Sequence, residues 1–172
     1  MAAFTDDDRG ALDFELLRDG ATTLYRRRTR FEAAIDALAA LGYVVHRIDA
    51  ATREEFERGM TRALDFEGQF GYAPWTGSLD ALVDAFRGVA FAGRGVVFAF
   101  LRLDALHAVE PALARGTLDI LEGASRDYLL YGLRLIGLVQ TDDPDLDLGA
   151  LGGRGAQWNR SEWLAADRRA PL

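Results

Sequence analysis

Residues 96–101 read V-V-F-A-F-L, an uninterrupted apolar run. A strand with apolar side chains at every position must be covered on both faces, which is typical of a central strand in a parallel sheet. Residues 43–48 and 133–139 are also predicted to be strands, and predicted helices separate the three segments. Helices of this length between strands favour parallel pairing with right-handed crossovers. The sequence therefore predicts an α/β fold with a parallel three-stranded sheet at its centre, packed with helices.

Two helices are predicted to follow capping boxes, in which a Thr and a Glu three residues later satisfy free amides of the first helical turn. The boxes are formed by Thr29 with Glu32 and by Thr52 with Glu55. The apolar residues behind them recur at helical spacing: Phe31, Ile35 and Leu38 in the first helix, and Phe56, Met60, Ala63 and Leu64 in the second. Gly42 is placed to end the first helix.

Two further helices are predicted over residues 104–113 and 117–131, with a break near Arg115-Gly116. Near the start of the chain, residues 14–17 and 21–25 flank Asp19-Gly20, a dipeptide typical of hairpin turns. This N-terminal segment is therefore expected to add one or two strands to the sheet.

The segment after the last predicted strand has two parts. Residues 142–147 are acidic and residues 149–155 are rich in glycine, so this stretch is predicted to be a flexible exit from the core. Trp158 and Trp163 follow it, and their large rings favour docking back onto the domain. A disordered tail is the alternative.

Composition limits the class of protein. The chain has 172 residues, 49% of them hydrophobic, so residues 1–172 are predicted to form a single domain with a substantial core. A net charge of −7 argues against nucleic acid as a direct ligand and suits a basic partner. The absence of cysteine excludes disulfides and thiol catalysis. The sequence shows neither a signal peptide nor an apolar run of membrane-spanning length, so we expect a cytoplasmic protein that does not bind membranes.

The sequence contains no recognisable catalytic or metal-binding pattern. His46 and His107 lack the spacing of a paired metal site and are interpreted as structural. No serine lies in the G-x-S-x-G motif of hydrolases: they are Ser78, Ser125 and Ser161. The alternating aspartates of residues 143–147 are similar to a calcium loop, but Leu148 stands where that loop requires glycine. We therefore expect neither an enzyme nor a bound metal or cofactor.

Residues 77–86, G-S-L-D-A-L-V-D-A-F, are predicted to form a short amphipathic helix. Four apolar residues have the spacing of one helical stripe: Leu79, Leu82, Val83 and Phe86. Asp80 and Asp84 then share the solvent-facing side. Like charges at this spacing destabilise a helix by roughly 0.2–0.5 kcal/mol, so stability alone does not require the pair. The alternative interpretation is an ordinary solvated face.

This region resembles the barstar family, the intracellular inhibitors of barnase-type ribonucleases. The resemblance lies in the aromatic and glycine residues before the helix, in its L-D-A-L-V-D segment and in the strand after it. The resemblance covers residues 43–140, where the predicted elements follow the order of the family. Asp127, about one turn before Gly132, matches an acidic residue that the family carries before the glycine leading into its last strand. Residues 12–42 and 141–172 would be N-terminal and C-terminal extensions, and the latter contains a W-N-x-x-E-W segment similar to that of longer bacterial members.

The loop before the helix departs from the pattern of the family. Aligned without a gap, Trp75 takes the family's aromatic position, Ser78 its asparagine and Ala85 its cysteine. Alternatively, Phe70-Gly71 is the family's aromatic-glycine pair, and residues 72–76 are an insertion in the binding loop.

The resemblance implies an inhibitor or immunity protein that binds a basic ribonuclease or ribonuclease-type toxin. Asp80 and Asp84 would accept hydrogen bonds from cationic side chains where RNA phosphates sit, so inhibition would be steric and electrostatic. Tyr72 and Trp75 would be aromatic anchors beside them, or would pack down as a loop plug. The other implied partner-binding residues are Gly77, Ser78 and Val83, with Asp127 and Tyr131 as a second contact patch. The alternative is a non-inhibitory interaction module that binds another basic protein.

Overall fold

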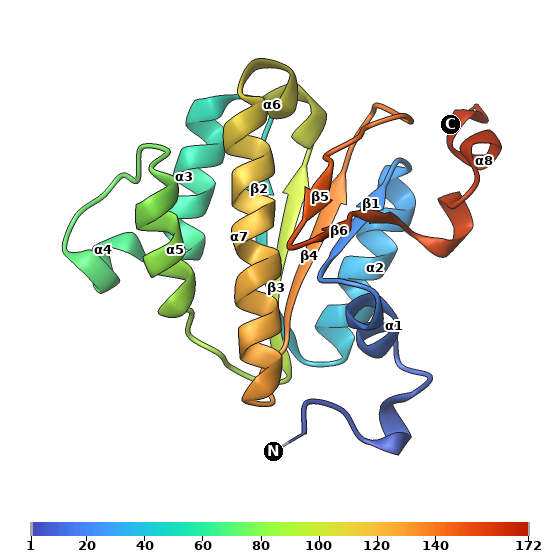
Figure 1. Cartoon of the computed structure of the whole chain (residues 1–172), viewed down its shortest axis with the longest axis horizontal. Coiled ribbons are helices and arrows are strands. Elements are labelled where there is room, and N and C mark those ends of the chain that lie inside the picture. The colour runs from blue at the N-terminus through green and yellow to red at the C-terminus, as the bar shows by residue number, and fades with distance from the viewer. Residues whose placement is uncertain (1, 172) are drawn as a thin grey trace.

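The computed structural model describes residues 2–171 and has an α/β fold built around a parallel sheet (Figure 1). Within the described residues this sheet has five strands, in the spatial order β2 (Tyr43–Asp49), β3 (Gly95–Leu101), β4 (Leu135–Gln140), β1 (Thr22–Tyr25) and β7 (Gln157–Trp158). Every neighbouring pair is parallel. The predicted α/β fold and parallel pairing are confirmed. The sheet has five strands and not three, because β1 and β7 extend it beyond β4: β1 is a strand that the N-terminal segment was expected to add, whereas β7 was not predicted.

β3 is the central strand that its composition predicts. It pairs with β2 on one side and β4 on the other, and all of its residues are buried. β2 lies at the edge of the sheet, where Val44 is 38% exposed. His46 of β2 is half-buried against the ring of Phe98, with ring centroids 5.4 Å apart. Burial lowers the pKa of His46, which is consistent with a neutral structural role.

Helices cover both faces of the sheet. α1 (Leu12–Arg18) and α2 (Arg28–Ala40) lie on one face, and α3 (Arg53–Ala63), α5 (Leu79–Arg87) and α7 (Pro111–Leu130) lie on the other (Figure 1). Right-handed crossovers require this division, because the chain runs in one direction across the sheet from β1 to β2 and in the other from β2 to β4. The shorter helices α4 (Phe66–Phe70) and α6 (Leu103–Val109) complete the connections.

Of the two predicted capping boxes, the one at Thr52 forms only in part: Thr52 caps α3, but the Glu55 carboxylate bonds to the Thr52 hydroxyl and not to its backbone amide. The Thr52 hydroxyl accepts a hydrogen bond of 3.2 Å from the Glu55 amide and donates one of 3.0 Å to the Glu55 carboxylate, so α3 begins as predicted. The predicted box at Thr29 and Glu32 is wrong. α2 begins at Arg28, and the Glu32 carboxylate instead pairs with Arg47 of β2 at 2.6 Å.

The predicted N-terminal hairpin is wrong. Residues 14–17 belong to α1, and β1 pairs in parallel with β4 instead of turning back on a neighbouring strand. Three leucines at helical spacing form the face of α1 that packs against the core. Leu17 is 7% exposed, and Leu12 and Leu16 are partly buried. Asp19-Gly20 therefore joins a helix to a strand.

The predicted break near Arg115-Gly116 is also wrong, because α7 runs without interruption through both residues. The break between α6 and α7 falls at Glu110, and Pro111 occupies the first turn of α7, where its missing amide costs no helical hydrogen bond. Gly116 has a packing role. A β-carbon there would lie 2.6 Å from the side chain of Leu79, so glycine allows α5 to approach α7 closely.

The predicted flexible exit is an ordered segment that packs onto the domain, and β4 is not the last strand. β5 (Ala150–Leu151) and β6 (Arg154–Gly155) form a small antiparallel hairpin. The three leucines before and within it are buried: Leu146, Leu148 and Leu151. Arg115 of α7 donates hydrogen bonds to the carbonyls of Leu148 at 3.2 Å and Ala150 at 2.9 Å.

The C-terminal tail docks onto the domain, as the prediction for Trp158 requires. Trp158 lies in β7 beside β1. The guanidinium of Arg168 lies over its ring, 4.5 Å from the ring centroid. The tail continues through η2 (Arg160–Glu162) to α8 (Ala165–Arg169). Trp163 differs from the expectation, because 58% of its surface stays exposed.

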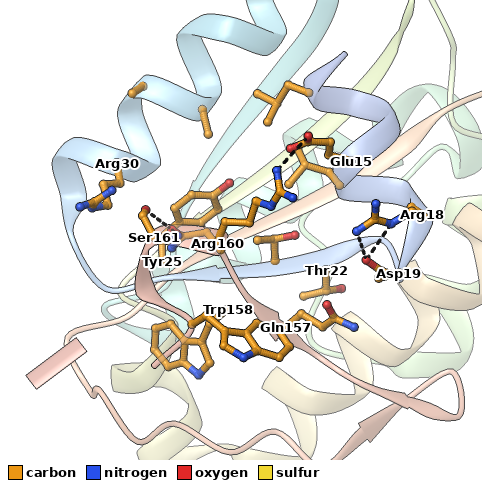
Figure 2. Close-up of a pocket in the computed structure, with 18 residues that line it drawn as sticks. Glu15, Arg18, Asp19, Thr22, Tyr25, Arg30, Gln157, Trp158, Arg160 and Ser161 are labelled. Atoms are coloured by element: carbon orange, nitrogen blue, oxygen red, sulfur yellow. Dashed lines mark hydrogen bonds and ion pairs between the residues drawn. The ribbon is translucent and has the colours of Figure 1, made fainter. Parts of the chain in front are cut away.

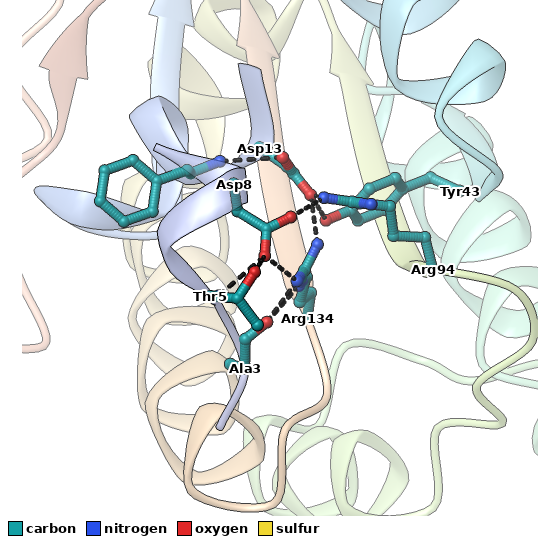
Figure 3. A network of polar contacts seen from close by, with 8 residues as sticks. Ala3, Thr5, Asp8, Asp13, Tyr43, Arg94 and Arg134 are labelled. Atoms are coloured by element: carbon teal, nitrogen blue, oxygen red, sulfur yellow. Dashed lines mark hydrogen bonds and ion pairs between the residues drawn. The ribbon is translucent and has the colours of Figure 1, made fainter. Parts of the chain in front are cut away.

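A buried ionic cluster closes the end of the sheet where its central strands begin (Figure 3). The carboxylate of Asp13 in α1 is fully buried and accepts hydrogen bonds from the Tyr43 hydroxyl at 2.7 Å, Arg94 at 2.7 Å and Arg134 at 2.6 Å. Burial acts to raise the pKa of Asp13, but the hydrogen bonds and charges of its partners outweigh it, so the pKa falls below its usual value. The cluster therefore holds a charged Asp13.

Candidate protein-interaction surface

α5 has the amphipathic form that its sequence predicts. It begins after Ser78, whose hydroxyl accepts a hydrogen bond of 3.3 Å from the Ala81 amide. Leu82, Ala85 and Phe86 are fully buried, and Val83 is half-buried at the edge of the stripe. The core side of the helix is therefore complete without any acidic residue.

Asp80 and Asp84 are both exposed on the solvent side of α5. Within the described residues, Asp80 forms no hydrogen bond or ion pair through its side chain. Asp84 pairs with Arg87 of the same helix at 3.0 Å, and the two side chains are 61% and 75% exposed. Arg87 lies three residues after Asp84, which is the spacing of a helical ion pair, so the sequence alone could have indicated this partner. Neither aspartate contributes to packing.

Trp75 is a loop plug and not an exposed anchor. Its side chain is 1% exposed and stacks on Phe66 with ring centroids 6.0 Å apart. Its backbone amide donates to the Thr61 hydroxyl at 2.9 Å, and its indole Nε1 donates to the Ser78 carbonyl at 2.9 Å. The interpretation of Trp75 as a surface anchor is therefore incorrect in this conformation, because no part of the indole is free to contact a partner.

The exposed aromatic surface of this region comes instead from Phe70 and Tyr72. Their side chains are 40% and 46% exposed, and their ring centroids lie 6.0 Å apart. Phe66 supports both rings from below, with centroid distances of 5.4 Å to Phe70 and 5.8 Å to Tyr72. Tyr72 therefore keeps the exposure that a partner contact requires. Phe70, which only the alternative alignment of the loop places in the family's motif, is an additional exposed residue beside it.

Gly77 makes the turn from this loop into α5. Its φ of +84° lies in the left-handed region, which side chains rarely adopt, and a β-carbon there would lie 3.0 Å from the guanidinium of Arg53. Arg53 is itself paired with Glu57 at 2.9 Å and Glu110 at 2.7 Å. Gly77 and Ser78 thus set the start and direction of the acidic helix.

The second predicted patch lies at the end of α7. Asp127 is exposed, and 75% of the Tyr131 surface is accessible. The Tyr128 hydroxyl donates a hydrogen bond of 2.7 Å to the carbonyl of Phe86, which joins the ends of α7 and α5. The start of α5 instead meets Gly116, near the start of α7. The second patch therefore lies nearer to Asp84 than to Asp80.

No family model matches this chain, and neither a curated protein nor a solved structure does. In residues 2–171, no group of three or more histidine and acidic side chains is arranged to hold a metal ion. No helix in the same residues combines the length and the apolar character needed to cross a membrane.

Proposed function

We propose that this chain is a barstar-like intracellular inhibitor or immunity protein that binds a basic ribonuclease or ribonuclease-type toxin through α5. The main support is the exposed pair Asp80 and Asp84 on a helix whose core side is already filled. The sequence resemblance to the barstar family over residues 43–140 supplies the class of partner. The net charge of −7 fits a cationic active site.

In this proposal the two carboxylates accept charge-assisted hydrogen bonds from arginine, lysine or histidine side chains that would otherwise hold RNA phosphates. Asp84 exchanges Arg87 for a cation of the enzyme. That exchange costs little, because an exposed ion pair of this kind contributes only about 0–1 kcal/mol. The rest of the domain then blocks the active-site groove of the ribonuclease sterically, so inhibition requires no chemical step.

Tyr72 and Phe70 provide the apolar part of the proposed contact. Aromatic side chains are enriched at interface hot spots because they bury a large area with few rotatable bonds. Trp75 acts indirectly, since its packing on Phe66 and its hydrogen bond to Ser78 hold the loop against the start of α5. Asp127 and Tyr131 lie at the Asp84 end of the surface and form its second contact.

The proposal is tested by adding this chain to a barnase-type ribonuclease while following hydrolysis of a fluorogenic oligoribonucleotide. We expect activity to fall in proportion to added protein and to vanish at a one-to-one ratio. A stable complex that keeps full ribonuclease activity would instead favour the non-inhibitory interaction module. Absence of any complex by size-exclusion chromatography would contradict the inhibitor proposal.

A further inference from the structure

A cavity of about 560 Å³ lies between α1, β1, α2 and the docked tail (Figure 2). Its volume is within the range of about 300–1,000 Å³ that is typical of small-molecule sites. It occupies the face of the sheet covered by α1 and α2, whereas α5 covers the other face. The cavity is therefore separate from the proposed interaction surface, and its properties do not depend on that proposal.

The floor of the cavity carries two hydroxyl groups. Thr23 and Tyr25 are two residues apart on β1, so both side chains point to the α2 side of the sheet. They are only 7% and 5% exposed, and within the described residues neither hydroxyl has a hydrogen-bond partner. Burial raises the pKa of Tyr25 far above its usual value, so the phenol stays protonated. Both hydroxyls thus face the cavity with accessible oxygens and without a protein acceptor in the part of the chain that the structure describes.

The walls are mainly apolar. They come from Leu12 and Leu16 of α1, Ala34 of α2 and the ring of Trp158 in the tail. Figure 2 shows the Trp158 indole along the lower side of the group of lining residues. Leucine, alanine and indole surfaces of this kind favour a flat apolar body.

The rim carries more positive than negative charge. Arg160 pairs with Glu15 at 3.2 Å, which joins the tail to α1, and Arg18 pairs with Asp19 at 3.0 Å. Arg30 of α2 also lines the cavity, and within the described residues its side chain forms no ion pair. Figure 2 shows this exposed guanidinium at the rim and turned away from the other lining residues, so it receives an anionic group only by turning toward the cavity.

We propose that this cavity binds a planar aromatic organic anion. Its ring system would lie against Trp158, its carboxylate or similar group would meet Arg30, and an acceptor atom would receive a hydrogen bond from the hydroxyl of Tyr25 or Thr23. Because the tail supplies one wall and α1 and α2 supply the others, such a ligand connects the tail to the body of the domain.

The probe for this proposal is 1-anilinonaphthalene-8-sulfonate, which combines flat aromatic rings with one anionic group. Binding is measured by fluorescence titration and by isothermal calorimetry on the full chain. Ala33 is exposed on α2 and lines the cavity, so Ala33→Trp fills the site without altering the core. Ala37, one turn further along the same helix, is exposed and lies outside the lining, so Ala37→Trp is the matched control.

We expect saturable binding with one site per chain, at least about tenfold weaker in Ala33→Trp and within about twofold of the parent in Ala37→Trp. Arg30→Gln should weaken binding several-fold, whereas Arg62→Gln, an exposed change on α3, should not. Equal affinities of the two tryptophan variants, or binding that does not saturate, would overturn the proposal. If Ala33→Trp does not fold, the double variant Thr23→Val/Tyr25→Phe decides, because loss of both hydroxyls should weaken binding of the probe and unchanged affinity would contradict the site.

Discussion

The carboxylate of Glu162 accepts a hydrogen bond of 2.9 Å from the backbone amide of Arg27, a residue 135 positions earlier in the chain. It accepts a second from the amide of Arg26, also at 2.9 Å. Arg27 is the N-cap of α2 and offers the helix no side-chain acceptor. The tail therefore supplies the negative charge and the acceptors that the start of α2 lacks.

Glu162→Ala should lower the free energy of unfolding by about 1–3 kcal/mol, because it leaves two partly buried amides without their acceptor. Urea denaturation measures the loss, and faster proteolysis after residue 155 would show that the tail has detached. Glu54→Ala is the control, since the Glu54 side chain is 84% exposed and its removal should cost less than about 1 kcal/mol. Equal stability of the two variants would show that Glu162 does not hold the tail.

Asp13→Asn should destabilise the protein by about 3 kcal/mol, because it removes the buried anion between Arg94 and Arg134. Asp7→Asn, an exposed change in the preceding 3-10 helix η1 (Asp6–Asp8), is the matched control and should have little effect. Thermal and urea unfolding of both variants provide the measurement. A stability loss below about 1 kcal/mol for Asp13→Asn would indicate that the cluster does not hold α1 to the sheet.

Acid should destabilise the fold. Hydrogen bonds from the Thr5 amide, the Thr5 hydroxyl and Arg94 lower the pKa of Asp8 to about 2, and the pKa of Asp13 is also lowered. A carboxylate with a lowered pKa in the folded state takes up protons first in the unfolded chain, so its stabilisation is complete above about pH 4 and is lost as the pH falls toward about 2. We expect the free energy of unfolding to fall over this interval, less steeply in Asp13→Asn. A flat profile would contradict the assignment.

The parts of the fold that follow from the sequence are those fixed by local pattern. The apolar run of residues 96–101 identifies β3, and helical spacing places Leu82 and Phe86 inside and Asp80 and Asp84 outside. Both patterns indicate which face of an element is buried, and burial of apolar surface is the largest stabilising contribution to folding.

The errors arise where distant partners decide the structure. Asp19-Gly20 is typical of a hairpin turn, whereas the leucines of α1 follow helical spacing, and it is the helix that forms because its leucines find the core. The acidic composition of residues 142–147 predicts a flexible linker, but aspartate alternates with leucine before Gly149, and Leu146 and Leu148 are buried. Asp13 meets Arg134 across 121 residues, and no local pattern records such a pair.

For the same reason the sequence predicts the orientation of α5 in the candidate site but not the conformation of the loop before it. Periodicity orients α5, but the loop of residues 71–77 has no periodicity, so its sequence does not distinguish an exposed indole from a buried one. Contacts of Trp75 with Thr61 and Phe66 decide that it is buried.

Association with the ribonuclease should depend strongly on salt. An acidic surface and a basic active site attract each other over a distance that dissolved ions screen, so the association rate constant should fall at least about tenfold from low to near-physiological ionic strength. The dissociation rate constant should change much less. Stopped-flow fluorescence gives both constants. An association rate that does not respond to salt would favour an apolar contact centred on Phe70 and Tyr72 instead.

The account depends most on the separation of binding from stability at Asp84. Asp84→Ala removes an exposed ion pair with Arg87 and relieves repulsion from Asp80, so the free energy of unfolding should stay within about 0.5 kcal/mol of the parent. The control Asp36→Ala makes the same change of charge at an exposed position on α2.

The decisive measurement is the dissociation constant of the ribonuclease complex for these two variants, by calorimetric titration beside thermal melts. We predict that Asp84→Ala weakens binding by at least about 2 kcal/mol, or roughly 30-fold, with an unchanged melt, and that Asp36→Ala binds as the parent does. Unchanged affinity of Asp84→Ala, or an equal loss in both variants, would show that α5 is not the binding surface.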